Sequence, residues 1–141
     1  MPSRFASRCA VKALALALIC PALALAKPPE SFWRAIHLVE TSGRHGPILG
    51  DNGSALGPLQ IHRAYWSDSR VSGAYEQCAE LAYARRVAEA YLRRYAPRAY
   101  AAGDWRTLAR VHNGGPAGHR RSATLPYLRK VERAMQRVAQ R

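Results

Sequence analysis

The sequence predicts one mainly helical domain, with about five helices and a small irregular β-type insertion between the first two. Apolar residues recur at helical spacing along most of the chain, and the exception is a glycine-rich stretch at residues 43–57. The 141 residues, 48% of them hydrophobic, suffice for one domain core and are too few for two. With only 10 glycines and 9 prolines, collagen-like and wholly disordered chains are excluded.

Residues 1–26 have the features of an export signal. The segment starts with basic residues and no acid, continues with an apolar run at 13–19, and ends in Ala24-Leu25-Ala26, which offers small residues to a signal peptidase. The apolar run is short and Pro21 interrupts it, which argues against a permanent membrane anchor. We therefore expect cleavage after Ala26, a functional domain at 27–141, and a periplasmic or secreted location.

Removal of this segment leaves a basic domain with one cysteine. Nineteen basic and nine acidic side chains remain, a net charge of +10, and Cys78 is the only cysteine left. No disulfide can then form within the domain. The charge favours non-specific binding of anionic polymers. It does not indicate a specific nucleic-acid partner.

The first two helices flank the glycine-rich stretch. Ser31 is expected to cap a helix that ends near Glu40 and buries an apolar stripe of Phe32, Ile36 and Val39. Residues 43–57 predict turns or a small irregular hairpin. Pro58 is expected in the first turn of a second helix, which carries Ile61, Ala64 and Tyr65.

Three further helices follow. Residues 75–95 predict one long helix that has Cys78 on its buried face and ends before Pro97. Asp104 is expected to cap a short helix that stops at the run 112–116, His-Asn-Gly-Gly-Pro. Thr124 is expected to cap the last helix.

Two of the nine acids lie where a pair of carboxyl groups could act together. Glu40 is expected at the end of a helix, where the helix dipole and apolar cover favour a protonated carboxyl group. Asp51 lies in the glycine-rich segment, where backbone N–H groups can hold a carboxylate ionised. A protonated and an ionised carboxyl facing one cleft are the minimal apparatus of glycoside hydrolysis. A helix-closing Glu and an Asp-Asn-Gly turn are also common for local reasons, so spacing alone leaves this open.

Other chemistries lack their motifs. The chain has no phosphate-binding loop, no paired CxxC, no HExxH and no GxSxG. We therefore expect neither a metal nor a cofactor.

Several longer motifs extend this picture. They include Gly57-Pro58-Leu59-Gln60-Ile61, then Ala64-Tyr65-Trp66-Ser67-Asp68, and the run from His112 to Gly118. In this order they resemble the invertebrate-type lysozyme (destabilase) family, and the likeness extends from Glu40 to Tyr127. The resemblance implies an α+β lysozyme-like fold and a muramidase that hydrolyses the β-1,4 bond between N-acetylmuramic acid and N-acetylglucosamine. Its partner would be the glycan strands of peptidoglycan.

The resemblance also implies roles for individual residues. Glu40 matches the general acid, although Thr41 departs from the tight E-S-G form, and Asp51 matches the second catalytic carboxylate. Six further residues match positions that line the substrate cleft: Gln60, Ile61, Tyr65, His112, Asn113 and Gly114. The animal enzymes are rich in disulfides, so this chain resembles a disulfide-free relative.

Two alternatives remain open. A lytic transglycosylase shares the helix-end glutamate and needs one acid only, so a dispensable Asp51 would favour it. A non-catalytic basic module that binds the cell wall would retain Glu40 for structure alone and would lose binding as salt rises.

Overall fold

Six α-helices and a small sheet make up the described part of the chain. The computed structural model describes residues 27–140, so the predicted export signal lies outside the described residues. The helices are α1 (Glu30–Thr41), α2 (Arg63–Ser69), α3 (Leu81–Tyr95), α4 (Pro97–Ala101), α5 (Trp105–Gly114) and α6 (Leu125–Ala139). The strands are β1 (Leu49–Gly50), β2 (Ala55–Leu56) and β3 (Ile61–His62). The predicted fold class, mainly helical with a β insertion after the first helix, is confirmed.

The strands form one antiparallel sheet in the order β1-β2-β3. Leu56 pairs with Leu49 on one side and with Ile61 on the other. A single turn of 3₁₀ helix, η1 (Asp51–Gly53), connects β1 to β2. The insertion therefore holds the predicted hairpin and a third strand that the sequence did not indicate.

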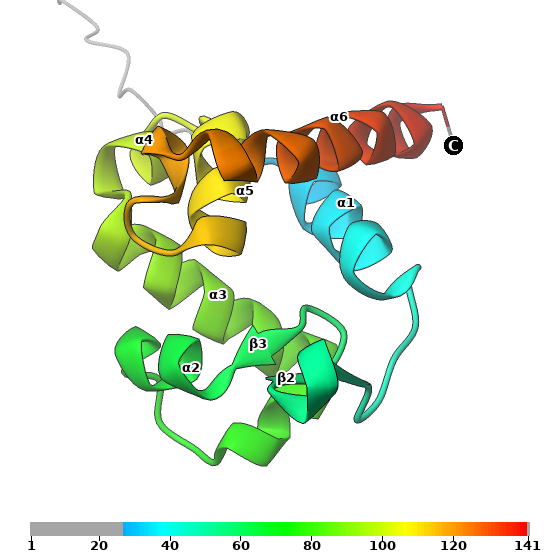
Figure 1. The fold of residues 1–141 in the computed structure, drawn as a ribbon, viewed down its shortest axis with the longest axis vertical. Helices are drawn as coiled ribbons and strands as arrows, with labels where there is room; N and C mark the ends of the chain where they lie inside the picture. The colour runs from blue at the N-terminus through cyan, green and yellow to red at the C-terminus, as the bar shows by residue number, and fades with distance from the viewer. Residues whose placement is uncertain (1–26, 141) are drawn as a thin grey trace, which may run out of the picture.

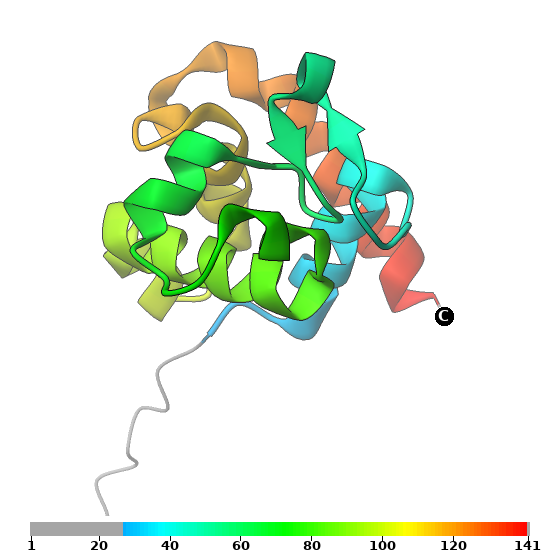
Figure 2. The ribbon, with the colours of Figure 1, turned by 90° about the horizontal axis from the view of Figure 1, so that it is seen from below.

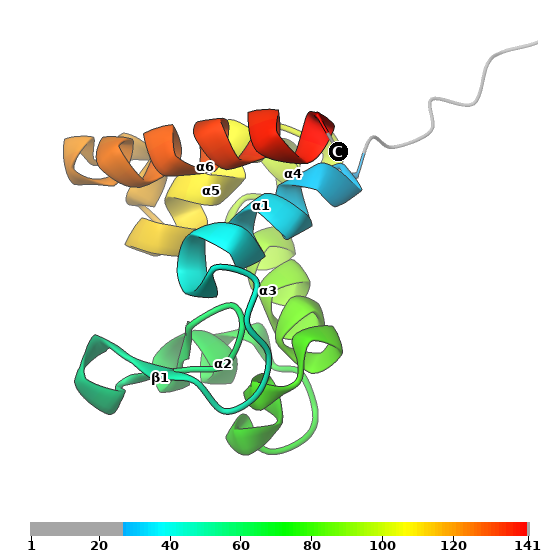
Figure 3. The same cartoon turned by 90° about the vertical axis from the view of Figure 1, so that its right-hand side faces the viewer.

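Helix α3 connects the two ends of the molecule (Figures 1 and 3). The sheet and α2 lie at one end, and α1, α4, α5 and α6 gather at the other. Helix α1 packs along α6, and its C-terminal end leads into the sheet. Figure 2 shows the sheet beside α2 from below. The end of α1, the sheet and the end of α5 can thus border one cleft.

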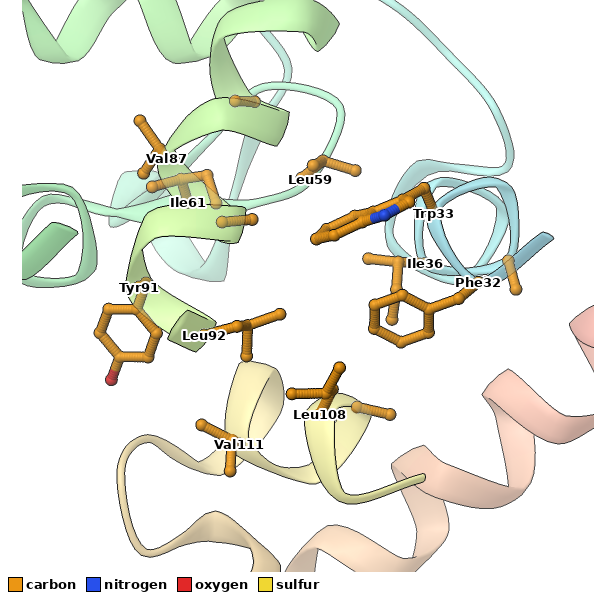
Figure 4. Close-up of a cluster of buried hydrophobic side chains, with 14 of the residues drawn as sticks. Phe32, Trp33, Ile36, Leu59, Ile61, Val87, Tyr91, Leu92, Leu108 and Val111 are labelled. Carbon is orange, nitrogen blue, oxygen red and sulfur yellow. The ribbon is translucent and has the colours of Figure 1, made fainter. Parts of the chain in front are cut away.

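The core lies where α1, α3 and α5 meet, and it also takes in residues of the β2–β3 region (Figure 4). Phe32, Trp33 and Ile36 of α1 face Leu92 of α3 and Leu108 of α5, all at most 4% exposed. Their spacing in α1 gives the apolar stripe that the sequence predicts. Packing of these side chains fixes the direction of α1 and so the position of its last turn.

The second predicted helix begins later than expected. Pro58 lies in the turn between β2 and β3, and α2 begins only at Arg63. Ile61 therefore belongs to β3 and is 1% exposed. Proline suits a turn as well as the first turn of a helix, and here pairing with β2 decides between them.

Other element boundaries also differ from the prediction. The segment 75–95 is two elements, the 3₁₀ helix η2 (Tyr75–Ala79) and α3, because the backbone at Glu80 is extended. Helix α4 begins at Pro97, directly after the predicted stop. Asp104 caps α5 as predicted, since its side chain accepts a hydrogen bond from the backbone N–H of Thr107.

Two predicted helix caps are wrong. Pro29 occupies the cap position of α1, which places Ser31 inside the first turn. Thr124 precedes α6 but caps nothing, because its hydroxyl donates to the backbone carbonyls of Gly118 and Arg121 instead. A short polar side chain bonds whichever backbone group lies nearest, and the sequence does not show that group.

Cys78 is a buried free thiol, as its position on an apolar face predicts. Burial raises the pKa of this thiol to about 11. The helices of residues 27–140 include none long and apolar enough to cross a bilayer.

Candidate active site

A cleft of about 310 Å³ opens between the end of α1, the sheet and the end of α5. Carboxyl, amide and imidazole side chains make up most of its lining: Glu40, Asp51, Ala55, Gln60, His62, His112 and Asn113. Five of these residues belong to the set that the sequence predicts. The fold thus brings residues from distant parts of the chain to one place.

Glu40 occupies the last turn of α1, where the helix closes on Ser42 in a left-handed conformation. Its side chain is 17% exposed. The Tyr127 hydroxyl of α6 donates a hydrogen bond of 2.5 Å to Oε1, and His112 Nε2 of α5 lies 3.5 Å from the same oxygen. Two neighbouring helices therefore hold one carboxyl oxygen, while no described residue hydrogen-bonds Oε2.

Tyr65 contacts His112 on the side of the ring that faces away from Glu40. The Tyr65 hydroxyl lies 3.0 Å from Nδ1, and the Tyr65 ring stacks on Tyr91 with centroids 3.6 Å apart. A neutral imidazole carries one hydrogen, so a Tyr65 hydroxyl that donates to Nδ1 leaves the hydrogen on Nε2. That nitrogen faces Glu40. Tyr65 thus holds the His112 ring in place beside the carboxyl group.

The tyrosines around Glu40 remain neutral phenols. Burial, followed by the charge of Glu40, raises the pKa of Tyr127 well above its usual value of 10.0. Burial raises the pKa of Tyr65 in the same way, and it raises the pKa of Tyr91 to about 12. Tyr127 therefore keeps the proton that it donates to the carboxyl group at neutral pH.

Because the pKa values of these buried tyrosines are raised, we expect the protein to lose stability in alkaline solution. Their pKa values are raised in the folded state, so above pH 10 the unfolded chain releases protons that the folded chain keeps. Stability should be fully present below about pH 10 and should fall as pH rises toward 12. Tyrosinate absorbance and circular dichroism, followed together, test this. Full tyrosinate absorbance with unchanged helix content would contradict it.

The side chain of Asp51 is exposed to solvent, unlike the largely covered side chain of Glu40. Asp51 opens η1 with a φ of +49°, and its side chain is 67% exposed. His62 of β3 places Nε2 3.4 Å from Oδ2. Asp is among the few residues that adopt this backbone conformation at small cost. The cleft therefore joins one largely covered carboxyl group with one solvated carboxyl group.

Gln60 lines the cleft and also supports the sheet. Its amide nitrogen donates to the backbone carbonyls of Gly57, at 2.9 Å, and Ile48, at 3.2 Å. A Cβ at Gly50 would lie only 1.7 Å from the Gln60 Oε1. The glycine therefore makes room for this side chain against the strand that leads to Asp51.

Three residues that the resemblance places in the cleft do not line it. Ile61 is buried in the core and leaves no surface for a sugar. Tyr65 lies behind His112, and Gly114 packs against Thr124, whose side chain a Cβ there would meet at 2.4 Å. The prediction of substrate contact is corrected for Ile61, because its side chain is buried, whereas for the half-buried Tyr65 and Gly114 it stays a prediction.

Two residues of the site were missed. His62 alternates with the buried Ile61 on β3, so the period of a strand would have pointed it outward had the strand been recognised. Tyr127 follows Glu40 by 87 positions, and no local pattern links them.

The arrangement suits acid catalysis beside a charged carboxylate. A covered carboxyl group fixed by a phenol can deliver a proton, and a solvated carboxylate can attack or stabilise a cationic centre. Among residues 27–140, no three His, Cys, Asp or Glu side chains converge in a way that could hold a metal ion.

Comparison with known sequences identifies lysozymes. Lysozyme 1 of Crassostrea virginica is 41% identical over 83 residues, which are 57% of this chain and 45% of that protein. The lysozyme of Ostrea edulis is 35% identical over 80 residues, and the match covers 58% of it. The lysozyme of Meretrix lusoria is 35% identical over 98 residues, 67% of this chain and 80% of that protein. The matches span about half the length of the first two relatives.

Solved structures give the same result. The crystal structure of Tapes japonica lysozyme superposes with a TM-score of 0.63 and 27% identity, over 74% of this chain and 88% of that one. Inhibitor-bound lysozyme from Meretrix lusoria gives a TM-score of 0.64 and 28% identity over the same shares. No family model matches the chain.

Proposed function

The chain belongs to the invertebrate-type lysozyme family, and on this premise we propose that it is a muramidase. Its substrate is the glycan strand of peptidoglycan, cut at the β-1,4 bond between N-acetylmuramic acid and N-acetylglucosamine. The observation that carries the proposal is the pair of unlike carboxyl groups, Glu40 and Asp51, in one cleft.

Glu40 is the general acid. Its proton passes to the glycosidic oxygen as the bond from that oxygen to the anomeric carbon breaks, which avoids an alkoxide leaving group. Asp51 attacks the anomeric carbon, or stabilises the oxocarbenium-like centre that forms there. Glu40, now a carboxylate, takes a proton from the water that attacks next. Release of the sugar restores both side chains.

Tyr127 and His112 act as positioning residues in this scheme. Both lie at Oε1 of Glu40, so the proton that is transferred is best carried by Oε2. Asn113, at the end of α5, and Gln60 supply amide groups to the cleft for neutral sugar hydroxyls.

The test is a mass spectrum of the fragments that residues 27–141 release from purified peptidoglycan. Free reducing muramic ends support hydrolysis, whereas anhydro ends would replace the muramidase with a lytic transglycosylase. No fragments at all would favour the non-catalytic wall-binding module.

Asp51→Asn separates these reactions. Hydrolysis through a second carboxylate predicts a loss of roughly 10²-fold or more in the rate of fragment release, with circular dichroism unchanged. The side chain is largely exposed, so the amide should fit without cost to the fold. A variant as fast as the wild type would exclude a catalytic role for Asp51.

We also propose that the protein is exported and that residues 1–26 are removed. The basic start, the apolar run and the small residues before Lys27 support this. N-terminal sequencing of the exported protein should begin near Lys27, and a start elsewhere would refute the assigned boundary.

A further inference from the structure

A second groove, of about 340 Å³, runs between α1 and α6. Figure 3 shows the two helices side by side. Three cations from α6 and apolar side chains from both helices form its walls, and the full lining is Leu38, Val39, Ser42, Lys130, Arg133, Ala134 and Arg137.

The three cations of the groove have no acidic partner. Lys130, Arg133 and Arg137 are exposed, and no described carboxylate lies within 4.0 Å of them. Glu132, on the same helix, is engaged by Arg106. The cations follow one another at spacings of three and four, so they form a row about 10 Å long on one face of α6. Such a row attracts a ligand that carries several negative charges.

The catalytic cleft has no permanently charged cation among its lining residues. Its lining holds the carboxyl groups Glu40 and Asp51 and no lysine or arginine. The proposed substrate has neutral sugars, and its carboxylates belong to the peptides attached to muramic acid. A cation for these peptides must therefore come from outside the cleft.

The groove lies close to the catalytic acid along both helices. Leu38 and Val39 directly precede Glu40, and Lys130 follows Tyr127 by one helical turn. A peptide attached to a strand in the cleft, or to a neighbouring strand of the same network, is thus within reach.

We propose that the α1–α6 groove binds the peptide stems of peptidoglycan, an inference that rests on the proposed function. Stem carboxylates pair with Lys130, Arg133 and Arg137, and small apolar side chains of the stem contact Leu38, Val39 and Ala134. A concave groove with apolar side chains in its walls fits a peptide better than a bilayer surface. Mixed charge and apolar contact also fit a peptide better than a pure polyanion.

The test compares two triple variants of equal charge. K130Q/R133Q/R137Q removes the cations of the groove, and R98Q/R120Q/R129Q removes three exposed arginines that do not line the groove and form no ion pair within residues 27–140. Both are made in Glu40→Gln protein, so that the polymer stays intact. Binding to insoluble peptidoglycan is measured by sedimentation, with and without removal of the stems by an amidase.

The groove variant should bind intact peptidoglycan about tenfold more weakly than the control variant. After removal of the stems, the two variants should bind equally. Equal binding to intact peptidoglycan would overturn the proposal. A groove-specific loss that persists without stems would also overturn it, in favour of another anionic polymer of the wall.

Soluble stems give an independent measurement. Stems freed by the amidase should shift the backbone amide resonances of Leu38, Val39 and Ala134 in wild-type protein and leave those of the groove variant unchanged. Shifts confined to other residues would overturn the proposal. Stem binding by a protein that releases no fragments would instead refute the muramidase, so the two failures are distinguishable.

Discussion

Replacing Glu40 by glutamine is expected to lower the rate of peptidoglycan cleavage roughly 10³-fold or more. An amide has nearly the shape of the acid but cannot transfer a proton to the leaving oxygen. The Tyr127 hydroxyl can still donate to the amide oxygen, so the local structure should persist. Fragment release from peptidoglycan, quantified by mass spectrometry, gives the rate, and sedimentation with the polymer should show that binding is retained.

Glu80→Gln is the matched control for this change. Glu80 is exposed, lies between η2 and α3, and forms no ion pair within residues 27–140. Its replacement alters the net charge equally and should leave the rate unchanged. Full activity of the Glu40→Gln protein would exclude Glu40 as the acid.

The Gly57→Ala substitution is expected to lower the free energy of unfolding by about 2–5 kcal/mol. Gly57 has a φ of +80°, and a Cβ there would lie 1.8 Å from the backbone oxygen of Cys78. Backbone cannot swing aside as a side chain can. The methyl group must therefore separate the β2–β3 turn from η2. The thermal midpoint should fall by roughly 10 °C or more, which calorimetry measures.

Gly53→Ala separates the cost of a positive φ from the cost of the contact with the Cys78 backbone. Gly53 has a similar φ of +86°, but nothing lies within 4 Å of its added Cβ. It should therefore show the backbone cost alone, about 1 kcal/mol. Equal losses in the two variants would show that contact with η2 contributes nothing.

Elements with a strong local signal could be predicted from the sequence. The stripe of Phe32 and Ile36 identified α1, and Asp104 fixed the start of α5 through a bond to its own helix. Segments whose conformation depends on residues far away in the sequence could not be predicted in this way. Ile61 fits a helix by periodicity, and only pairing with Leu56 makes it part of a strand.

The same distinction applies to the site. Glu40 and Asp51 could be selected because acids are few in a basic chain and because their surroundings match a family pattern. Their partners Tyr127 and His62 could not, because Tyr127 reaches Glu40 only through the packing of α6 against α1, and His62 faces Asp51 only once β3 has paired with β2. Residues such as Tyr65 and Gly114 belong to the motifs but support the cleft from behind.

The lone, buried Cys78 has a practical consequence. No disulfide stabilises the fold of residues 27–140, and its one thiol is buried away from oxidants and exchange partners. Reducing agents should therefore leave its activity intact, and the domain should mature without thiol oxidation enzymes. Expression of residues 27–141 in the bacterial cytoplasm should yield active protein directly.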